Sequence, residues 1–283
     1  MVKLGITSNA YINSELFHID FESLSKDGYE TIDFQDFIRG ESYIYKFSEE
    51  EFKNYLSLLK EELDKYSLKI SQLHALWHPE MEKMDRSFIK SAIRKAILGA
   101  SILKCPYVVF HPLSPISWDT PFTKDEIINY NTNFINDLIP LLEKLNVNLA
   151  IENLPFFSVP DFFSVKGTYE FIKSFNNENI VMCLDTGHMN MFKDDPYEDI
   201  LLIKDKLRVL HIHDNNGQSD SHLFPYMGNI DWEKIIKGLK DIDFDGSFSF
   251  ETGAPKSAPI NARREMEIAL SLIGKDFKNK INN

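Results

Sequence analysis

The feature that most constrains the fold is a regular alternation of short apolar runs with segments of helical periodicity. Strands that alternate with helices form parallel βαβ units, and eight such units in a chain of 283 residues match the size of a (β/α)8 barrel. We therefore predict an α/β fold, a (β/α)8 TIM barrel, as a single domain over residues 1–283. The predicted strands are residues 3–7, 29–34, 68–74, 107–110, 147–151, 180–184, 207–212 and 247–250.

Helix signals fill the intervals between these strands. Ser48 with Glu51, and Thr123 with Glu126, have the spacing of capping boxes. They predict helices over residues 48–66 and 123–145, and Asp231 is expected to cap another over 231–239. A doubly wound sheet is the structural alternative, but residues 7–10 lack the Gly-rich turn that this fold places after its first strand. Further helices are expected over residues 16–24, 86–103, 169–174, 197–206 and 261–273.

Composition limits the classes of partner. The net charge is −12, which disfavours binding to a phosphate backbone unless one face is locally basic. No apolar run approaches the length of a membrane span, and the first residues lack the layout of a signal peptide. Cys105 and Cys183 lie in or beside apolar runs and are expected to be buried thiols. These features predict a cytoplasmic protein without membrane partners.

Acids and histidines follow the predicted strands at the points where the strands end. In a barrel of this type, catalytic groups sit at the carboxyl ends of the strands, so these side chains are expected to meet at one mouth. Imidazoles and carboxylates that converge in this way are typical ligands of a divalent metal ion. The residues concerned are His74, His111, Glu152, Asp185, His188, His211 and Glu251, and the loop after the seventh strand adds Asp220 and His222.

Each of these residues also has a purely structural interpretation. A single buried histidine, such as His74 or His213, is more often a hydrogen-bonded core residue than a ligand. Glu152 and Glu251 favour a site, because each follows an apolar run and a buried, unpaired carboxylate costs several kcal/mol. Two interpretations of Asp214 stay open: capping a short helix, or orienting a ligand histidine. For the aromatic residues near the mouth, a hydrophobic substrate wall is favoured over core packing: Trp77 with His78, Phe156, Phe157, Phe162 and Phe163.

Several short motifs together resemble the xylose isomerase-like TIM barrels. This group includes sugar phosphate isomerases and epimerases, ketose 3-epimerases, inosose dehydratase-like proteins and apurinic endonucleases of the same fold. The resemblance covers nearly the whole chain and rests on the order and spacing of the motifs. They are Val-Val-Phe-His111-Pro, Ala-Ile-Glu152-Asn, Leu-Asp185-Thr-Gly-His188, His211-Ile-His-Asp and Phe-Glu251-Thr.

The resemblance implies roles for individual residues. The metal ligands of the epimerase branch match Glu152, Asp185, His211 and Glu251, and His188 matches the histidine that contacts a substrate oxygen. Residues 220–232 resemble a family loop, with Tyr226 in place of the first of its two usual glycines. The implied reaction is a metal-dependent isomerisation or epimerisation of a sugar, sugar phosphate or related polyol through an enediolate-type intermediate. Glu152 and Glu251 are the expected acid and base pair, and His188 would polarise the substrate oxygen.

The resemblance also supplies alternatives. His74, His111, Asp220 and His222 complete the ligand pattern of trinuclear zinc endonucleases, which predicts a phosphodiesterase instead. The loops at the mouth carry few cations, so nucleic acid is not the favoured partner. An inosose dehydratase-like lyase and a catalytically silent sugar-binding barrel are the other candidates. The ligand set favours zinc or manganese and also admits cobalt or magnesium. The expected partner is a carbohydrate, and a homo-oligomer is compatible with the sequence, which does not name the sugar.

Overall fold

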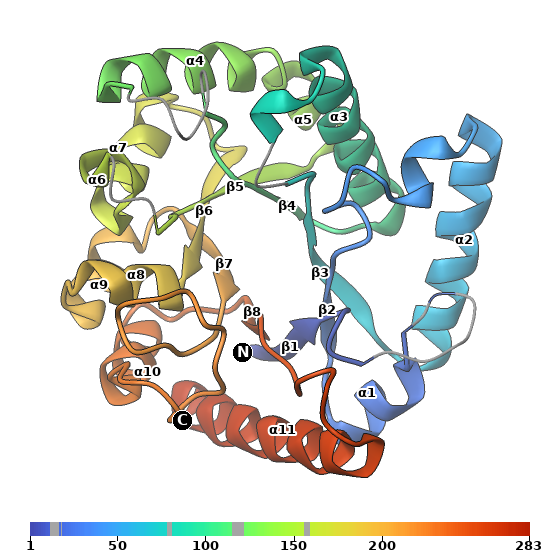
Figure 1. Ribbon diagram of the computed structural model, residues 1–283, viewed down its shortest axis with the longest axis vertical. Helices are drawn as coiled ribbons and strands as arrows, with labels where there is room; N and C mark the ends of the chain where they lie inside the picture. The colour runs from blue at the N-terminus through green and yellow to red at the C-terminus, as the bar shows by residue number, and fades with distance from the viewer. Residues whose placement is uncertain (12–16, 18, 78–80, 115–121, 156–158) are drawn as a thin grey trace.

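The computed structural model is a barrel of eight parallel strands surrounded by helices (Figure 1). Neighbouring strands pair in the order β7-β6-β5-β4-β3-β2-β1-β8. A parallel bridge between Ile212 and Phe250 closes the ring, with backbone hydrogen bonds of 2.9 Å from Ile212 to Ser249 and 3.0 Å from Glu251 to Ile212. The strands are β1 (Lys3–Thr7), β2 (Thr31–Phe34), β3 (Lys69–His74), β4 (Tyr107–Phe110), β5 (Asn148–Glu152), β6 (Ile180–Asp185), β7 (Leu207–His211) and β8 (Ser247–Phe250).

The predicted barrel and its strands are therefore confirmed. The structure describes the chain except residues 12–16, 18, 78–80, 115–121 and 156–158. The α-helices that it describes are α1 (Phe21–Asp27), α2 (Glu49–Lys65), α3 (Arg86–Leu103), α4 (Lys124–Asn136), α5 (Ile139–Leu145), α6 (Pro160–Phe163), α7 (Val165–Ser174), α8 (Thr186–Phe192), α9 (Pro196–Ile203), α10 (Trp232–Asp241) and α11 (Ile260–Asn282). Two 3-10 helices, η1 (Tyr43–Lys46) and η2 (Met81–Lys83), lie in the loops after β2 and β3.

Local sequence signals account for most helix ends. Both predicted capping boxes are present, and the side chain of Asp231 accepts a hydrogen bond from the Lys234 amide. The prediction of a single helix over residues 123–145 is wrong, because two helices cover this segment. Pro140 has no amide hydrogen to continue the α-helical pattern, and the chain divides there into α4 and α5.

Helix α8 begins directly at the end of β6, where no helix is expected from the apolar pattern. The carboxylate of Asp185 accepts a hydrogen bond of 2.6 Å from the His188 amide and so caps this helix. One turn of helix thereby places Asp185 and His188 beside each other. The last helix is also longer than predicted and extends to Asn282. Of the predicted first helix, residues 16 and 18 lie outside the described residues.

The barrel interior is filled by side chains rather than open. Val109, Ala150, Val181, Cys183 and Val209 form a buried apolar layer, and Tyr107 packs against it. Beside this layer, the buried Gln72 side chain reaches across the barrel and donates a hydrogen bond of 3.2 Å to the Leu210 carbonyl. Side chains at the two ends of the barrel are therefore separated from each other. Cys105 and Cys183 are free and buried, as predicted.

Among the described residues, the structure contains no helix with the length and hydrophobicity needed to cross a bilayer.

Candidate functional site

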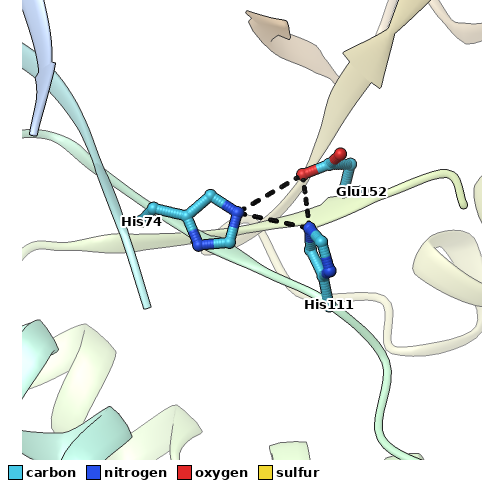
Figure 2. A group of neighbouring side chains, drawn as sticks. All are labelled: His74, His111 and Glu152. Atoms are coloured by element: carbon cyan, nitrogen blue, oxygen red, sulfur yellow. Dashed lines mark hydrogen bonds and ion pairs between the residues drawn. The ribbon is translucent and has the colours of Figure 1, made fainter. Parts of the chain in front are cut away.

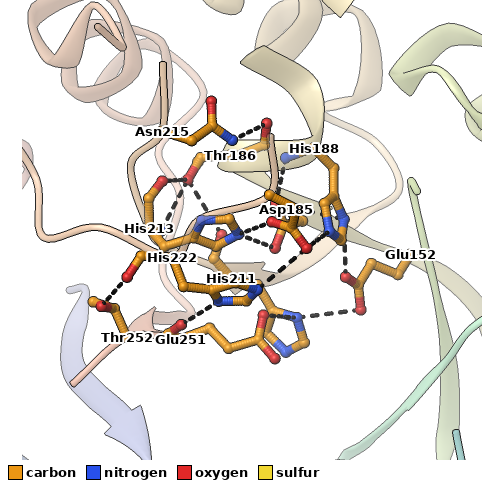
Figure 3. A network of polar contacts seen from close by, with 12 residues as sticks. Glu152, Asp185, Thr186, His188, His211, His213, Asn215, His222, Glu251 and Thr252 are labelled. Carbon is orange, nitrogen blue, oxygen red and sulfur yellow. Dashed lines mark hydrogen bonds and ion pairs between the residues drawn. The ribbon is translucent and has the colours of Figure 1, made fainter. Parts of the chain in front are cut away.

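The polar residues at the strand ends meet at the carboxyl end of the barrel. His74, Glu152, Asp185 and His211 are the last residues of β3, β5, β6 and β7. Strands β6 and β7 are in register such that Asp185 lies opposite His211. Figure 3 shows Glu152, Asp185 and His211 with their neighbours as one connected polar network. The sequence-based expectation of convergence at one mouth agrees with this arrangement.

His211 lies at the base of the site, fully buried, with carboxylates on both sides. Its Nδ1 atom is 3.2 Å from Glu152 Oε2 and 3.2 Å from Glu251 Oε2, and its Nε2 atom is 3.3 Å from Asp33 Oδ2. Neither ring nitrogen has a partner with hydrogen-bond geometry. Buried polar atoms without a hydrogen-bond partner are unusual. A cation bound between His211 and these carboxylates would provide the missing partner.

A second group of side chains shares Glu152 with the first (Figure 2). His74 and His111 face each other with their Nε2 atoms 3.2 Å apart, and Glu152 Oε2 is 3.0 Å from the His111 nitrogen and 3.8 Å from that of His74. His74 Nδ1 is 2.8 Å from the Ala75 carbonyl oxygen, which fixes the ring orientation. The three ligand atoms lie close enough together to hold one metal ion.

A third group lies toward the loop after β7. His188 Nε2 is 3.3 Å from Asp220 Oδ2, and His222 Nε2 is also 3.3 Å from that oxygen. The His213 ring stacks on His222 at 3.9 Å between centroids, and its Nε2 is 3.0 Å from Asp185 Oδ2. His222 is held from behind, because its Nδ1 is 2.7 Å from the Glu251 carbonyl oxygen. This arrangement provides further sets of three ligand atoms within reach of one ion.

The charges of these groups depend on one another. Burial alone would raise the pKa of the Glu152 carboxyl, but the imidazoles of His111 and His211 hold the pKa well below its usual range. The pKa of Glu251 is lowered in the same way, against burial, by His211. Burial opposes the charged form of His211, yet neighbouring negative groups, Glu251 and Glu152 among them, raise its pKa well above the usual value. The site therefore holds anionic carboxylates that need positive partners, whether protons or a metal ion.

The chemistry of the donor set fits a divalent metal ion. Each of the three groups combines imidazole nitrogens with carboxylate oxygens, and most of the ligand atoms are buried. Asn153 supports the arrangement: its side-chain oxygen accepts a hydrogen bond of 2.9 Å from the Asp185 amide, and its carbonyl oxygen is 2.9 Å from His188 Nδ1. Such contacts fix the orientation of metal-binding side chains.

A cavity of about 570 Å³ opens above these residues. Trp77 lies against His111, with ring centroids 5.4 Å apart, and lines the cavity as predicted. Ile38, Leu154 and Pro155 supply further apolar wall. No lysine or arginine is among the described lining residues, and residues 12–16, 18, 78–80, 115–121 and 156–158 include neither type in the sequence. The cavity therefore combines an apolar wall with an acidic, imidazole-rich base.

The prediction that Phe162 and Phe163 form a substrate wall is wrong. Both side chains are buried in the hydrophobic core, where Phe162 packs edge to face on Phe163 and also contacts Phe171. The short helix α6 turns them away from the mouth because burial of two large aromatic side chains is worth several kcal/mol. Phe156, Phe157 and His78 lie outside the described residues.

Asp214 has neither of the two roles considered for it. Its buried carboxylate accepts hydrogen bonds from the amides of Asn215, Tyr226 and Ile230 at 2.8, 2.9 and 3.2 Å, and from the Trp232 indole at 3.0 Å. It therefore holds together the two ends of the loop that carries Asp220 and His222. Tyr226, which replaces the first glycine of the similar family loop, has a φ of 73°. This position therefore has the left-handed backbone conformation that favours glycine.

Sequence reasoning missed residues that contact the site, among them Asp33 and Asn153, and it favoured a structural role for His213, which contacts Asp185. The signal for His213 is its spacing from His211, because alternate residues of an extended segment point the same way. The signal for Asp33 is an acid inside an otherwise apolar strand. Asn153 directly follows Glu152, but nothing in the sequence alone indicates that it bonds to the next strand.

Comparison with known proteins identifies the family. The model for xylose isomerase-like TIM barrels matches residues 21–272. The chain belongs to this family. Among curated relatives, an uncharacterized protein of Methanocaldococcus jannaschii is 29% identical over 69% of this chain and 68% of its own length. The D-psicose 3-epimerase of Agrobacterium fabrum is 27% identical over 55% of this chain, and the match spans about half, 54%, of that enzyme. The expected relation to sugar epimerases and isomerases is thereby confirmed.

Solved structures share this fold along almost the whole chain. A D-tagatose 3-epimerase-like protein superposes with a TM-score of 0.76 at 23% identity, covering 99% of this chain and 98% of that one. The IOLI protein, solved with a zinc atom, gives 0.72 at 20% identity, with coverage of 99% and 98%. At these identities the likeness shows the fold alone, so roles for individual residues rest on the geometry above.

Proposed function

We propose that this member of the xylose isomerase-like family is a divalent-metal-dependent isomerase or epimerase of an unphosphorylated sugar or related polyol. The observation that carries the proposal is the pair of carboxylates from β5 and from the end of β8, both 3.2 Å from the same nitrogen of His211. Named relatives with sugar epimerase or isomerase activity, including the D-psicose 3-epimerase and an inosose isomerase of Bacillus subtilis, support this class of reaction.

The metal ligands would be Glu152, Asp185, His211 and Glu251. A bound divalent ion supplies Lewis acidity to adjacent carbonyl and hydroxyl oxygens of the substrate, which makes the neighbouring C–H more acidic. Zinc and manganese suit this mixed set of imidazole and carboxylate ligands best, and cobalt or magnesium is compatible with it.

The proton transfers are assigned to Glu152 and Glu251. The two side chains approach His211 from different strands, so one is able to accept the proton from carbon while the other returns a proton. His188 would donate a hydrogen bond to the substrate oxygen. Its pKa is raised well above the usual value, against the effect of burial, by Asp185 and its other carboxylate neighbours, which favours the protonated, donating ring.

The lining of the cavity favours a neutral substrate. A phosphate group normally requires a lysine, an arginine or a helix N-terminus, and neither basic residue lines the described cavity. The apolar surface of Trp77 and Leu154 suits the C–H faces of a sugar instead.

The test uses the metal-loaded protein with a panel of ketoses, ketose phosphates and inososes in deuterated water. Turnover of an unphosphorylated compound is expected, with solvent deuterium incorporated at one carbon. Glu152→Gln and Glu251→Gln should each lower turnover by about 100-fold or more, whereas Glu178→Gln, at an exposed position, should not change it. The proposal is wrong if neither site variant reduces turnover of an identified substrate.

A second candidate is a phosphodiesterase that uses several metal ions. The observation in its favour is the presence of the two further groups, His74 with His111 and Glu152, and His213 with Asp220 and His222. The absence of basic residues from the described lining opposes binding of a nucleic acid. About three ions per chain together with cleavage of an abasic-site oligonucleotide would favour this function over the first.

A further inference from the structure

A second large cavity lies at the opposite, amino end of the barrel. Its volume is about 640 Å³, and it is lined by the first residues of β1, β2, β3, β4 and β8, by Arg208 of β7 and by the ends of α2 and α3. The buried layer around Val109 and Val181, and the Gln72 side chain, separate it from the candidate site. A ligand in this cavity would not compete with the substrate for space.

The charge of this cavity is opposite to that of the chain. The lining contains five basic residues, Lys3, Lys60, Lys69, Lys104 and Arg208, and two acidic residues, Asp64 and Asp245. The whole chain has 31 basic and 43 acidic residues. An excess of cations around one concave surface of an acidic protein produces a local positive potential that attracts anions.

Within the described part of the chain, the two acids of the lining do not form ion pairs with these cations. None of the five forms an ion pair there, whereas lysines on other surfaces, such as Lys90 with Asp137 and Lys173 with Asp205, do. The guanidinium of Arg208 donates instead to the carbonyl oxygens of Leu207 at 2.7 Å and Asp205 at 3.0 Å, which fixes its position without cancelling its charge. Unpaired cations that share a cavity repel one another, so an anion bound among them is stabilised.

The lining of the same cavity also contains apolar residues. Leu63, Leu68, Leu103, Pro106 and the half-buried Tyr107 line it. The volume falls within the range of sites for small organic ligands, and it is larger than an inorganic anion requires.

We propose that this cavity binds an organic phosphate of nucleotide size. Its phosphate groups, with at least two negative charges, lie among the five basic side chains, and an apolar or aromatic group lies against the leucines and Tyr107. The site is a binding site only and is separate from the reaction proposed above.

The experiment titrates the metal-loaded protein, freed of unbound metal, with ADP by isothermal calorimetry. Adenosine and pyrophosphate are titrated in parallel. Adenosine has the aromatic group without phosphate, and pyrophosphate has the phosphate groups without the aromatic group. ADP is expected to bind with a Kd between about 10 μM and 1 mM, more tightly than pyrophosphate, and more weakly as salt is added. Adenosine is expected to bind least.

The location is tested with a double charge reversal, Lys69→Glu with Lys104→Glu, since both side chains are exposed. It should weaken ADP binding about tenfold or more, because each change replaces an attraction with a repulsion. The matched control is Lys144→Glu with Lys240→Glu, two exposed lysines outside the cavity with the same change in net charge. The control should bind ADP like the unmodified protein.

If the double variant does not fold, chemical labelling of lysines in the unmodified protein tests the location of the site instead. ADP should protect Lys60, Lys69 and Lys104 from acetylation, quantified by mass spectrometry, and should leave Lys144 and Lys240 unprotected. The proposal is overturned by equal ADP binding in the double variant and the control, by the absence of ADP binding and lysine protection, or by adenosine binding as tight as that of ADP.

Discussion

At the scale of single residues, Gly187 makes room for a side chain of the site. A Cβ atom at this position would lie 2.0 Å from His213 Cε1, and the His213 ring has little freedom to move because it is buried, stacked on His222 and in contact with Asp185. The backbone of α8 accepts alanine readily, so the restriction comes from the ring and not from the conformation.

We expect Gly187→Ala to disturb the site more than the fold. The helical preference of alanine should stabilise α8 by about 1 kcal/mol, but the clash should cost on the order of 2 kcal/mol. Displacing His213 from Asp185 should also reduce metal affinity about tenfold or more, measured by competition with a chromophoric chelator. The double variant Gly187→Ala with His213→Ala should recover stability without recovering affinity. Unchanged metal affinity in Gly187→Ala would contradict a role for His213 in orienting Asp185.

Asp199 gives a residue-scale prediction for pH. Burial, together with the charges of Asp194 and Asp195, raises the pKa of this carboxyl from 3.8 to about 7, and its Oδ2 has no hydrogen-bond partner. The folded state therefore holds a proton that the unfolded chain has lost, and stability falls as pH rises from about 4 to 7. Asp199→Asn should remove this loss and raise the free energy of unfolding at pH 8 by on the order of 2 kcal/mol.

Urea unfolding at pH 5 and pH 8 provides the measurement. Glu198→Gln is the matched control, because Glu198 is the exposed neighbour on α9 and its loss changes the net charge equally. A stability difference between pH 5 and pH 8 that is the same in Asp199→Asn and the unmodified protein would show that Asp199 does not titrate in this range.

At the scale of structural elements, the loop between β7 and α10 depends on one carboxylate. Asp214 accepts four hydrogen bonds that join both ends of this loop, so the positions of Asp220 and His222 depend on it. The β6–α8 junction works similarly, because Asp185 both ends the strand and caps the helix. In each case, one carboxylate near the end of a strand fixes the positions of several site residues.

We expect Asp214→Asn to loosen this loop. An amide group has only one acceptor oxygen and directs its own hydrogens toward donors, so the folded protein should lose about 3 kcal/mol. Urea unfolding measures this loss, and limited proteolysis should show faster cleavage between residues 215 and 231. Asp231→Asn makes the same chemical change at a helix cap, where asparagine is as good as aspartate, and should have little effect. Equal cleavage rates in the two variants would refute the role of Asp214.

At the scale of the whole molecule, the fold and the candidate metal centre should be linked. The candidate ligands lie at the ends of four neighbouring strands, β5, β6, β7 and β8, and Glu251 follows the strand that closes the ring against β7. A bound ion would therefore connect segments that are distant in sequence and would bind the folded chain in preference to the unfolded one.

Removal of metal is expected to lower the melting temperature by about 5 °C or more, since an ion at 100 times its Kd contributes about 2.7 kcal/mol. Calorimetry before and after treatment with a chelator, followed by return of zinc or manganese, measures the effect. Asp185→Asn should melt at the same temperature with and without chelator. A melting temperature that neither chelator nor added metal changes would mean that no ion is bound at the strand ends.

The parts of this protein that follow from local sequence are the barrel and the position of its candidate ligands along the strands. Alternating periodicity and capping residues such as Ser48 are properties of neighbouring residues, so they predict elements directly. Glu152, Asp185 and His211 stand at strand ends, and parallel strands in one barrel bring those ends together. For the same reason, the convergence of acids and histidines at one mouth is predictable without coordinates.

Packing between distant segments accounts for the remainder. Asp33 of β2 contacts His211 of β7 only because the strands close into a ring, and Phe162 is buried rather than exposed because α6 folds back on α7. The basic cavity likewise gathers residues from six strands and two helices that no local pattern links. Sequence periodicity specifies which face of an element is apolar, but only the three-dimensional arrangement specifies which side chains meet across that face.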